Sequence, residues 1–441
     1  MKELPVFAEK KYHQRLKYVL DFLTHELTEI KWKISDSPAE LPNAFLVYSE
    51  KISTQACIRI TPGHFLEKGF LGSNIDPRFS QIDNSIWEKN RESYTCTFDM
   101  PGHVFFFLSR MEEYNRDVVS GPQNRFSAKE SVLYQSGLID FPIVDFWQNS
   151  FLEVLKKVMP DLKVHEKDFQ WELTCDVDLL FAFKGKGLLR NLAGLSRDLF
   201  FLKIKEFALR WNWLFSGGED PFDQLGKLIE LTNSEVTPLK TFILCPSSGD
   251  FQEDRTGFQF LKNHHDFFSK YGDLIKPGLH PSLGSNLNLD RLFQEKKQLE
   301  KFSGCQIKQS RQHYLALDIP TTYYNLLAVG IEEDYSMAFH DHIGFRAGTS
   351  LPFFWYDIEN EVPTKLKVQP FCLMDVSLKK YMRLSPDRAL EQAKKMIENL
   401  KAVNGNFLYL WHNSSLSDLD GWSAWSSFPS DLSDFAKNDK S

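Results

Sequence analysis

The hydrophobic and polar positions of residues 1–165 predict a mixture of helices and short strands. Over residues 12–27, four leucines recur at helical spacing and share roughly one face: Leu16, Leu20, Leu23 and Leu27. Residues 145–162 are typical of a longer helix that stops at Pro160. Three segments have the apolar character of strands: AFLVYS (44–49), ACIRI (56–60) and YTCTF (94–98). We therefore expect an α+β unit in this part of the chain.

From Trp171 onward the pattern changes to strands that alternate with helices. Five apolar segments predict strands: 171–175, 240–246, 274–280, 305–317 and 406–412. Helical periodicity lies between them, over 288–302 and over 385–405, where Ser385 and Pro386 suit a helix start and Gly405 suits its end. This alternation predicts a parallel sheet, closed or open. We place the boundary near 160–170, which divides the chain into 1–165 and 166–441.

Composition and charge exclude several classes of protein. In 441 residues, 42% are hydrophobic and 14% aromatic, which excludes a disordered chain. The net charge of −7, from 52 basic and 59 acidic residues, does not favour a nucleic-acid partner. The six cysteines are far apart and predict neither a zinc ribbon nor a disulfide framework. We find no signal peptide and no apolar run long enough for a transmembrane segment, and we expect a cytoplasmic protein.

The segment WELTCDVDLLF (171–181) carries two aspartates at the end of a predicted strand. Asp176 and Asp178 are two positions apart, so they share one face of an extended chain, roughly 6–7 Å from each other. Carboxylates near a core are costly unless a charged or hydrogen-bonding group meets them. The pair would suit a divalent metal, with one carboxylate as ligand and the other as base. The alternative is a turn or a helix cap, where aspartate is common.

Similar residues follow the other predicted strands. His280 ends one strand and enters the small-residue loop PSLGSN, and His412 ends another and enters a polar loop. Arg311 and His313 lie at a third strand end, and Asp334 lies in a segment rich in His and Asp. A lone histidine is more often a buried, hydrogen-bonded residue than a metal ligand. Four successive strand ends of this kind are difficult to explain by accident, because parallel sheets gather functional groups at that edge.

The order of these segments resembles the polysaccharide deacetylase (NodB-homology) superfamily over about 171–415. TCDVD is similar to the first motif of that superfamily, HPSLGS to the second, RQHYL to the third and LWHN to the fifth. The resemblance implies a distorted (β/α) barrel and a divalent metal, often zinc, that serves to remove acetyl groups from N-acetylated sugars. The preceding segments FFFLSRMEEYN and NRFSAKES resemble an uncharacterised accessory domain of a bacterial branch of the superfamily.

The resemblance also implies roles for the catalytic groups. Asp176 would be the general base, and Arg311 would orient it. His412 would be the general acid, with Asp334 loosely matching the fourth motif, which tunes that acid. An imidazole suits this role because its pKa lies near neutrality.

The metal ligands implied by the resemblance are Asp178 and His280. The superfamily usually has a second histidine four residues after the first, but Gly284 stands there in this sequence. The Pro-x-Gly of the third motif is also absent, and His313 stands near the place of its proline. Catalytic zinc normally has three protein ligands. We therefore expect either that His313 completes the site or that metal binding is weak or absent.

Three interpretations remain open at this stage. The first is a metal-dependent hydrolase acting on an N-acetylated sugar or glycan precursor. The second is a catalytically inactive protein of the deacetylase fold that binds a glycan or a protein partner. The third, a glycoside hydrolase, is disfavoured because two carboxylates on one strand cannot flank a glycosidic bond. Separately, residues 184–210 carry seven Lys or Arg against Asp198 and Glu206. This predicts either a helix pair with a solvated charged face or a basic helical insertion that grips an anionic lipid- or nucleotide-linked sugar.

Overall fold

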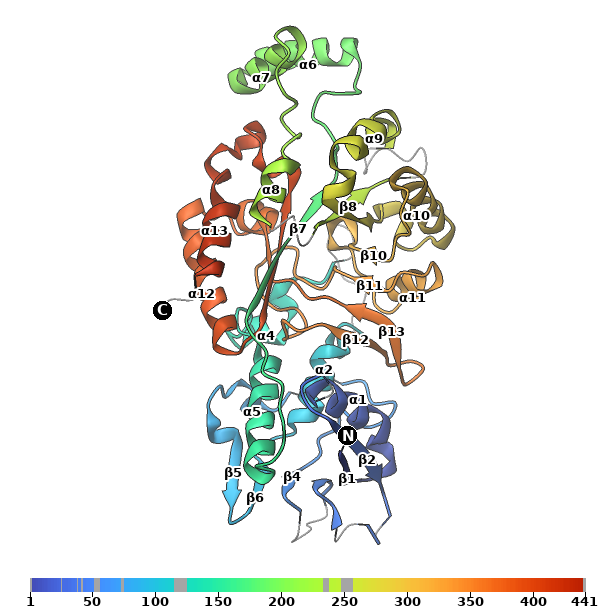
Figure 1. Ribbon diagram of the computed structural model, residues 1–441, viewed down its shortest axis with the longest axis vertical. Coiled ribbons are helices and arrows are strands. Elements are labelled where there is room, and N and C mark those ends of the chain that lie inside the picture. Colours follow the sequence, from blue (N-terminus) through green and yellow to red (C-terminus); the bar gives the residue numbers. More distant parts are fainter. Residues whose placement is uncertain are drawn as a thin grey trace.

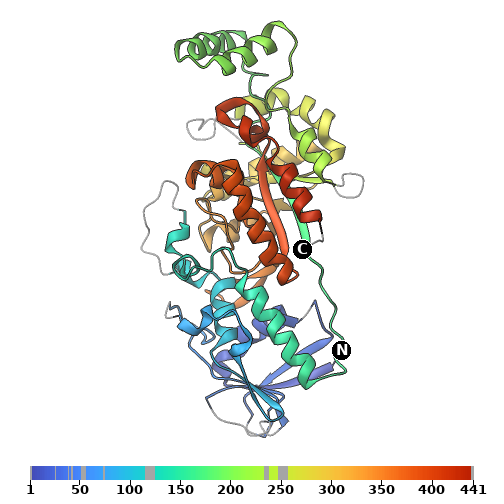
Figure 2. The ribbon, with the colours of Figure 1, turned by 90° about the vertical axis from the view of Figure 1, so that its left-hand side faces the viewer.

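The structure of the chain is a computed structural model (Figure 1). It describes residues 2–24, 26–37, 39–40, 43–50, 56–72, 75–114, 125–232, 238–246 and 257–438. Two sheets lie one above the other along the long axis, with the amino-terminal residues at one end (Figures 1 and 2). Among the described residues, no helix is both long enough and apolar enough to cross a membrane.

The first sheet has the order β2-β1-β3-β4-β6-β5. Its strands are β1 (Lys2–Ala8), β2 (Ile30–Ser35), β3 (Leu46–Tyr48), β4 (Ile58–Ile60), β5 (Trp87–Asn90) and β6 (Ser93–Cys96). All neighbours are parallel except β5 and β6. The three strands expected in this region match β3, β4 and β6. The sheet is mixed: the helix α1 connects β1 to the parallel strand β2, whereas β5 and β6 form an antiparallel pair.

Five helices accompany the first sheet. They are α1 (His13–Thr24), α2 (Met100–Leu108), α3 (Met111–Tyr114), α4 (Val132–Gln135) and α5 (Ile143–Val158). In α1, the predicted apolar stripe is buried at Leu16, Leu20 and Leu23, and the helix ends before Leu27. The helix α2 is buried along its whole length, which explains its run of three phenylalanines.

The second sheet has nine strands in the order β12-β13-β11-β10-β9-β8-β7-β15-β14. They are β7 (Gln170–Val177), β8 (Leu239–Leu244), β9 (Ile275–His280), β10 (Gln309–Ser310), β11 (Glu333–Asp334), β12 (Phe353–Asp357), β13 (Val362–Val368), β14 (Leu373–Met374) and β15 (Asn406–His412). All neighbours are parallel except the β12–β13 hairpin. The strand expected over 305–317 is reduced to β10, because a short 3-10 turn begins at His313.

The second sheet is curled rather than flat. Arg311, directly after β10, donates a hydrogen bond of 2.8 Å to Asp176 on β7. In a flat sheet these strands would stand three spacings apart, about 14 Å. Inside the curl, buried side chains from several strands pack together: Phe242, Tyr335, Phe371, Met374, Leu408 and Leu410. The expected distorted barrel is thus an open, curled α/β sheet, with β12 and β14 as its edges in the part of the chain that the structure describes.

Helices cover the outside of the curled sheet. On one side lie α12 (Pro386–Ala402) and α13 (Phe428–Lys437), and on the other α9 (Gly257–Tyr271), α10 (Leu289–Ser303) and α11 (Thr321–Ala328) (Figure 1). The short α8 (Leu225–Leu231) lies beside α13 (Figure 1). Two further helices, α6 (Leu188–Phe200) and α7 (Ile204–Phe215), project beyond the rest of the molecule in both views (Figures 1 and 2).

Buried polar groups join the two parts of the chain. Glu113 accepts hydrogen bonds from Arg110 at 2.8 Å and from Arg346 at 2.9 and 2.5 Å. All three side chains are buried. Arg15 of α1 donates to Glu361 at 3.0 and 2.6 Å. One hydrophobic core runs through both parts, so the two parts form an extensive common interface.

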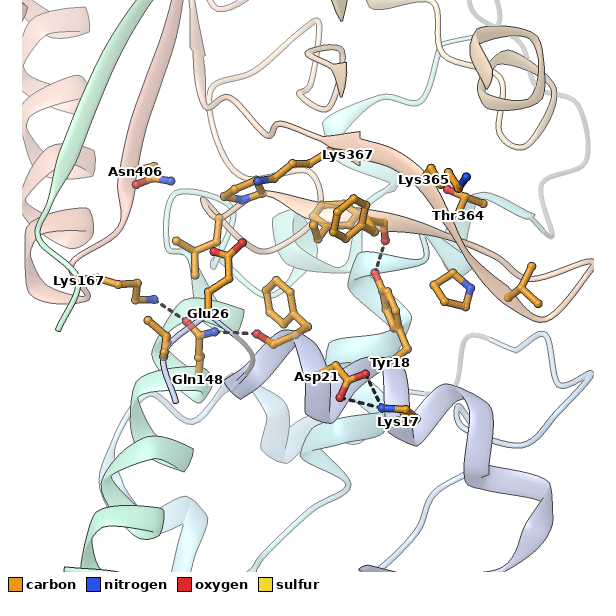
Figure 3. Close-up of a pocket in the computed structure, with 18 of the residues that line it drawn as sticks. Lys17, Tyr18, Asp21, Glu26, Gln148, Lys167, Thr364, Lys365, Lys367 and Asn406 are labelled. Carbon is orange, nitrogen blue, oxygen red and sulfur yellow. Dashed lines mark hydrogen bonds and ion pairs between the residues drawn. The ribbon is translucent and has the colours of Figure 1, made fainter. Parts of the chain in front are cut away.

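A cavity of about 870 Å³ lies at this junction (Figure 3). Its lining includes Tyr18 of α1, Gln148 of α5 and Phe354 of β12. It also reaches Gln170 and Asn406, the first residues of β7 and β15. The cavity therefore lies at the amino-terminal edge of the curled sheet. In parallel sheets, chemistry is found at the opposite, carboxyl edge.

Candidate active site

Four parallel strands bring the candidate residues together at the carboxyl edge of the curled sheet. Asp176 lies near the end of β7 and Asp178 directly follows that strand, while His280 and His412 are the last residues of β9 and β15. The register pairs His412 with Asp176 across neighbouring strands. The strands β7, β9 and β15 are apolar and buried along most of their length, and their polar residues lie at or directly after their carboxyl ends. The sheet thus collects into one place the groups that the sequence predicts at separate strand ends.

A group that could bind a metal consists of Asp178, His280 and His313. One potential ligand atom from each lies within 4.8 Å of the others. The Asp178 Oδ1 lies 3.3 Å from His280 Nε2 and 3.7 Å from His313 Nε2. His313 reaches this place because its 3-10 turn follows β10 directly, next to β9. These are the three residues that the sequence suggests as ligands.

The donor atoms of this group fit a divalent ion. His280 Nδ1 lies 2.6 Å from the carbonyl oxygen of Arg311, which can only accept, so Nδ1 carries the proton. In the neutral ring, Nε2 therefore presents its lone pair to the group. Within the described part of the chain, His280 Nε2 and Asp178 Oδ1 are buried and have no hydrogen-bond partner. Two nitrogens and one carboxylate oxygen are a donor set that suits zinc.

The surroundings favour a charged Asp178. Burial alone raises the pKa of this carboxyl, but His313, His280 and His412 together hold that pKa well below its usual range. For His280, burial lowers the pKa, and the carboxylates of Asp176 and Asp178 outweigh that effect and raise it. A metal ion at Nε2 would therefore compete with a proton for that nitrogen.

Asp176 is fixed by Arg311. The Arg311 guanidinium donates to Asp176 Oδ1 at 2.8 Å, to Thr174 Oγ1 at 2.9 Å and to the Tyr335 carbonyl at 2.9 Å. Its plane also lies over the ring of Phe242, 4.4 Å from the ring centre. Arg311 is fully buried. The second Asp176 oxygen, Oδ2, lies 3.8 Å from His280 Nε2, so this carboxylate borders the metal-binding group.

His412 borders the same group from the other side. Its Nε2 lies 3.9 Å from Asp178 Oδ2. The partner of the ring is Asp375, the residue after β14: Oδ1 lies 2.8 Å from Nδ1, and Oδ2 accepts from the His412 backbone N–H at 2.9 Å. Burial lowers the pKa of His412, but Asp375 raises it, with Asp178 and Asp176 adding to the effect, to about 10. The ring is thus a cation near neutrality.

Asp334 does not take the place expected for it. Its carboxylate accepts hydrogen bonds from Ser336 and Ser310, and burial raises its pKa to about 6. The carboxylate that contacts His412 is Asp375, which the sequence reasoning missed. The signal was present, because Asp375 follows the apolar run FCLM (371–374) in the same way that the other candidates follow their strands.

Comparison with known proteins gives a limited picture. Residues 4–160 match DUF7033, a family of unknown function. No curated protein matches the chain. The similar solved structures include one described as a polysaccharide deacetylase from Mycobacterium smegmatis, at 13% identity and a TM-score of 0.38, covering 61% of this chain and 85% of that one.

Two further solved structures are similar over a comparable length. Puue allantoinase has 10% identity and a TM-score of 0.37, covering 60% of this chain and 84% of that one. A mutant CE4 family pseudoenzyme with restored enzymatic activity has 9% identity and a TM-score of 0.30, covering 61% and 64%. At these identities and scores, the likeness assigns neither activity nor substrate.

Proposed function

We propose that the chain is a metal-dependent hydrolase that removes acetyl groups from an N-acetylated sugar or glycan precursor. The observation that carries this proposal is the grouping of Asp178, His280 and His313 between a carboxylate and an imidazole, each with its own buried partner. Asp176 and His412 border the group from the neighbouring strands β7 and β15. This is the arrangement that amide hydrolysis needs, with a base and an acid on either side of one electrophilic centre.

The residues of the chain divide the work between them. Asp178, His280 and His313 would hold the ion, which when bound supplies Lewis acidity toward the acetyl carbonyl and toward a water molecule. Asp176 would accept the proton of the attacking water, and Arg311 would keep its carboxylate aimed at that water. His412 would donate the proton at Nε2 to the leaving amine nitrogen, because its Nδ1 is occupied by Asp375.

Aromatic side chains beside the group support a sugar substrate. Tyr314 stacks on His313, with ring centres 3.8 Å apart, and is itself exposed. Tyr381 is also exposed, and its hydroxyl accepts a hydrogen bond of 3.1 Å from Arg125, which also donates to the Tyr314 carbonyl at 3.2 Å. Exposed aromatic faces offer apolar area to the C–H face of a sugar ring while their hydroxyls meet polar groups.

Zinc titration of the purified, metal-free protein tests the metal site. We expect calorimetry to show one tight zinc site in the wild type. Asp178→Ala and His313→Ala should each lose at least 100-fold in zinc affinity. Altering a residue that only contacts a ligand already costs roughly 10–100-fold, and removing the ligand itself should cost at least as much. The matched control is His64→Ala, whose side chain is 74% exposed in the first part of the chain. Deacetylation is then assayed on N-acetylated chito-oligosaccharides.

Two outcomes would contradict the proposal. If the wild type binds no zinc and no other divalent ion of the first transition row, the inactive binding protein becomes the better interpretation. If His313→Ala binds zinc as tightly as the wild type, the third ligand lies elsewhere and the assignment of His313 is wrong.

A further inference from the structure

The inference concerns the hairpin, which we define as residues 184–215. It contains α6 and α7, of 13 and 12 residues, joined by a turn over 201–203. It is inserted between β7 and α8, and it projects away from the body of the protein in both views (Figures 1 and 2). The candidate active site does not use any of its residues.

Three polar side chains of the hairpin lie between its helices. Arg210 donates to Asp198 at 2.9 Å and to Asn191 at 3.2 Å. All three residues are buried, with Asn191 and Asp198 at 1% exposure. The Asn191 amide also donates to the Phe183 and Gly187 carbonyls at the base of the hairpin. The two helices are therefore held together mainly by a polar network, with Leu195 as a buried apolar residue beside it.

Most large apolar side chains of the hairpin are exposed, although Leu209 and Trp213 are partly buried in a cluster with Phe183. Leu189 is 83% exposed, Phe200 80% and Leu202 78%. Exposed large apolar residues of the hairpin are Leu188, Leu189, Leu192, Leu199, Phe200, Phe201, Leu202, Ile204, Trp211 and Phe215. These ten are nearly half of the 21 exposed large apolar residues in the described part of the chain, although the hairpin is a small part of it. A soluble helix pair normally has the opposite arrangement, and a patch of this size marks a contact surface.

Basic residues are interleaved with this apolar surface. Arg190 and Arg197 are exposed on α6, and Lys203 and Lys205 flank the turn. Over residues 188–215 the acids are Asp198, which is buried against Arg210, and the half-buried Glu206, 3.9 Å from Lys203. The exposed face of the hairpin is thus positive, in a chain whose net charge is −7.

We propose that the hairpin docks on an anionic lipid surface, with the apolar turn and the outer faces of both helices inserted at the headgroup boundary. Each helix is shorter than the roughly 20 residues that cross a bilayer, so the hairpin would lie in the interface. Phenylalanine, leucine and tryptophan are the residues that enter this boundary, and Lys and Arg meet the anionic headgroups. A second copy is the less suitable occupant, because a symmetric contact would bring two positive faces together.

Co-sedimentation of the full chain with lipid vesicles tests the proposal. We expect binding to phosphatidylcholine vesicles that contain phosphatidylglycerol, binding that weakens as salt is raised, and little binding to phosphatidylcholine alone. Two double variants should each weaken vesicle binding on the order of tenfold or more: Phe200→Ser with Phe201→Ser, and Lys203→Glu with Lys205→Glu. One Lys near an anionic surface contributes about 1 kcal/mol to binding. Circular dichroism and the thermal midpoint show whether the variants stay folded.

Matched controls change equivalent residues elsewhere. Leu289→Ser with Phe293→Ser alters two exposed apolar residues of α10, and Lys156→Glu with Lys157→Glu alters two exposed lysines of α5. Both double variants should bind anionic vesicles as the wild type does.

Three results would overturn the proposal. The first is a wild type that does not bind anionic vesicles. The second is a wild type that binds neutral vesicles as well as anionic ones, or control variants that lose as much binding as the hairpin variants. The third is a wild-type dimer that Phe200→Ser with Phe201→Ser converts to a monomer without any vesicle binding, which would make the hairpin a contact between copies. None of these readouts depends on catalytic activity.

Discussion

Asp375 meets both the backbone N–H and the ring of His412, through its two carboxylate oxygens at 2.9 and 2.8 Å. The contact holds a proton on Nδ1, keeps the ring a cation near neutrality and leaves Nε2 toward Asp178. His412 also lies in register with Asp176 on the next strand. One carboxylate thereby sets the position and the charge of the proposed acid.

Replacing Asp375 should move the alkaline limb of the pH–rate profile. The acid works while it is protonated, so activity is lost as the pH rises through the pKa of His412, which Asp375 raises to about 10. Asp375→Asn keeps the shape and removes the charge, so we expect the limb to shift to lower pH and kcat at alkaline pH to fall about 100-fold. Asp334→Asn is the control and should leave the limb in place. A shift in Asp334→Asn alone would restore the sequence-based assignment.

The two aspartates of the first motif should separate in their effects. Asp178→Ala removes a ligand and should abolish zinc binding. Asp176→Asn keeps its contact with Arg311 and should bind zinc normally, yet lose about 100- to 10,000-fold in kcat because the base is gone. Zinc content by atomic emission and kcat on the same preparations check this. Equal metal content in Asp178→Ala and the wild type would contradict the division of roles.

Breaking the buried cluster at the junction should destabilise the whole protein. Glu113→Gln leaves Arg346 without its buried anion, and removing one partner of such a pair costs about 3–5 kcal/mol. The pKa of Glu113, which burial raises, is lowered to about 2 by Arg346 and Arg110, so the carboxylate is charged at neutral pH. Urea unfolding measures the loss.

The control for this prediction is Lys395→Gln. Lys395 is 68% exposed and lies 3.2 Å from Asp140. An exposed pair of this kind contributes little, so Lys395→Gln should change the free energy of unfolding by no more than about 1 kcal/mol. A loss in Glu113→Gln as small as that of the control would show that the cluster does not bind the two parts together.

His103 should make stability depend on pH. Burial lowers its pKa to about 4, although the hydrogen bond from Nδ1 to the Asp99 carbonyl acts to raise it. Its Nε2 accepts from the Asp76 N–H, which suits the neutral ring. The unfolded chain takes up the proton near 6.5, so stability contributed by neutral His103 is present above pH 6.5 and is lost as the pH falls toward 4. The full effect is about 3 kcal/mol.

Buried Asp99 opposes this trend. Burial raises its pKa to about 6, so the folded protein takes up a proton there more readily than the unfolded chain and gains stability as the pH falls. The effect of His103 is therefore measured as the difference between the wild type and a His103 variant. Urea unfolding at several pH values should show a shallower dependence on acid in His103→Gln than in the wild type. His64→Gln, at an exposed histidine, should keep the wild-type dependence. Identical curves for all three proteins would contradict the prediction.

Much of the second sheet could be predicted from the sequence, because apolar runs that end in a polar residue define both a strand and its functional end. Asp178, His280 and His412 follow this rule. The partners set by the curvature of the sheet could not be found this way, since Arg311 bonds to Asp176 across two intervening strands and 135 positions of sequence. Asp375 was missed because β14 is only two residues long, and a strand that short has no visible periodicity.

The first sheet was predicted less well for a related reason. Its strands β3 and β4 have three residues each, too few to distinguish parallel from antiparallel pairing. The cluster of Glu113 with Arg346 spans 233 positions, and no local pattern signals such a partner. Tertiary packing decides which charged residues are buried. A hydrophobic pattern predicts burial only for apolar residues.

The ion pair between Arg15 and Glu361 has a consequence for synthesis of the chain. The two residues are 346 positions apart, and both are buried in the finished protein. At 5–20 residues per second, a ribosome needs about 17–70 s to produce Glu361 after Arg15 has been made. During that interval α1 has a guanidinium without its carboxylate and an apolar stripe without part of its covering. The amino-terminal part therefore gains its full set of buried contacts only after residue 361 has been made.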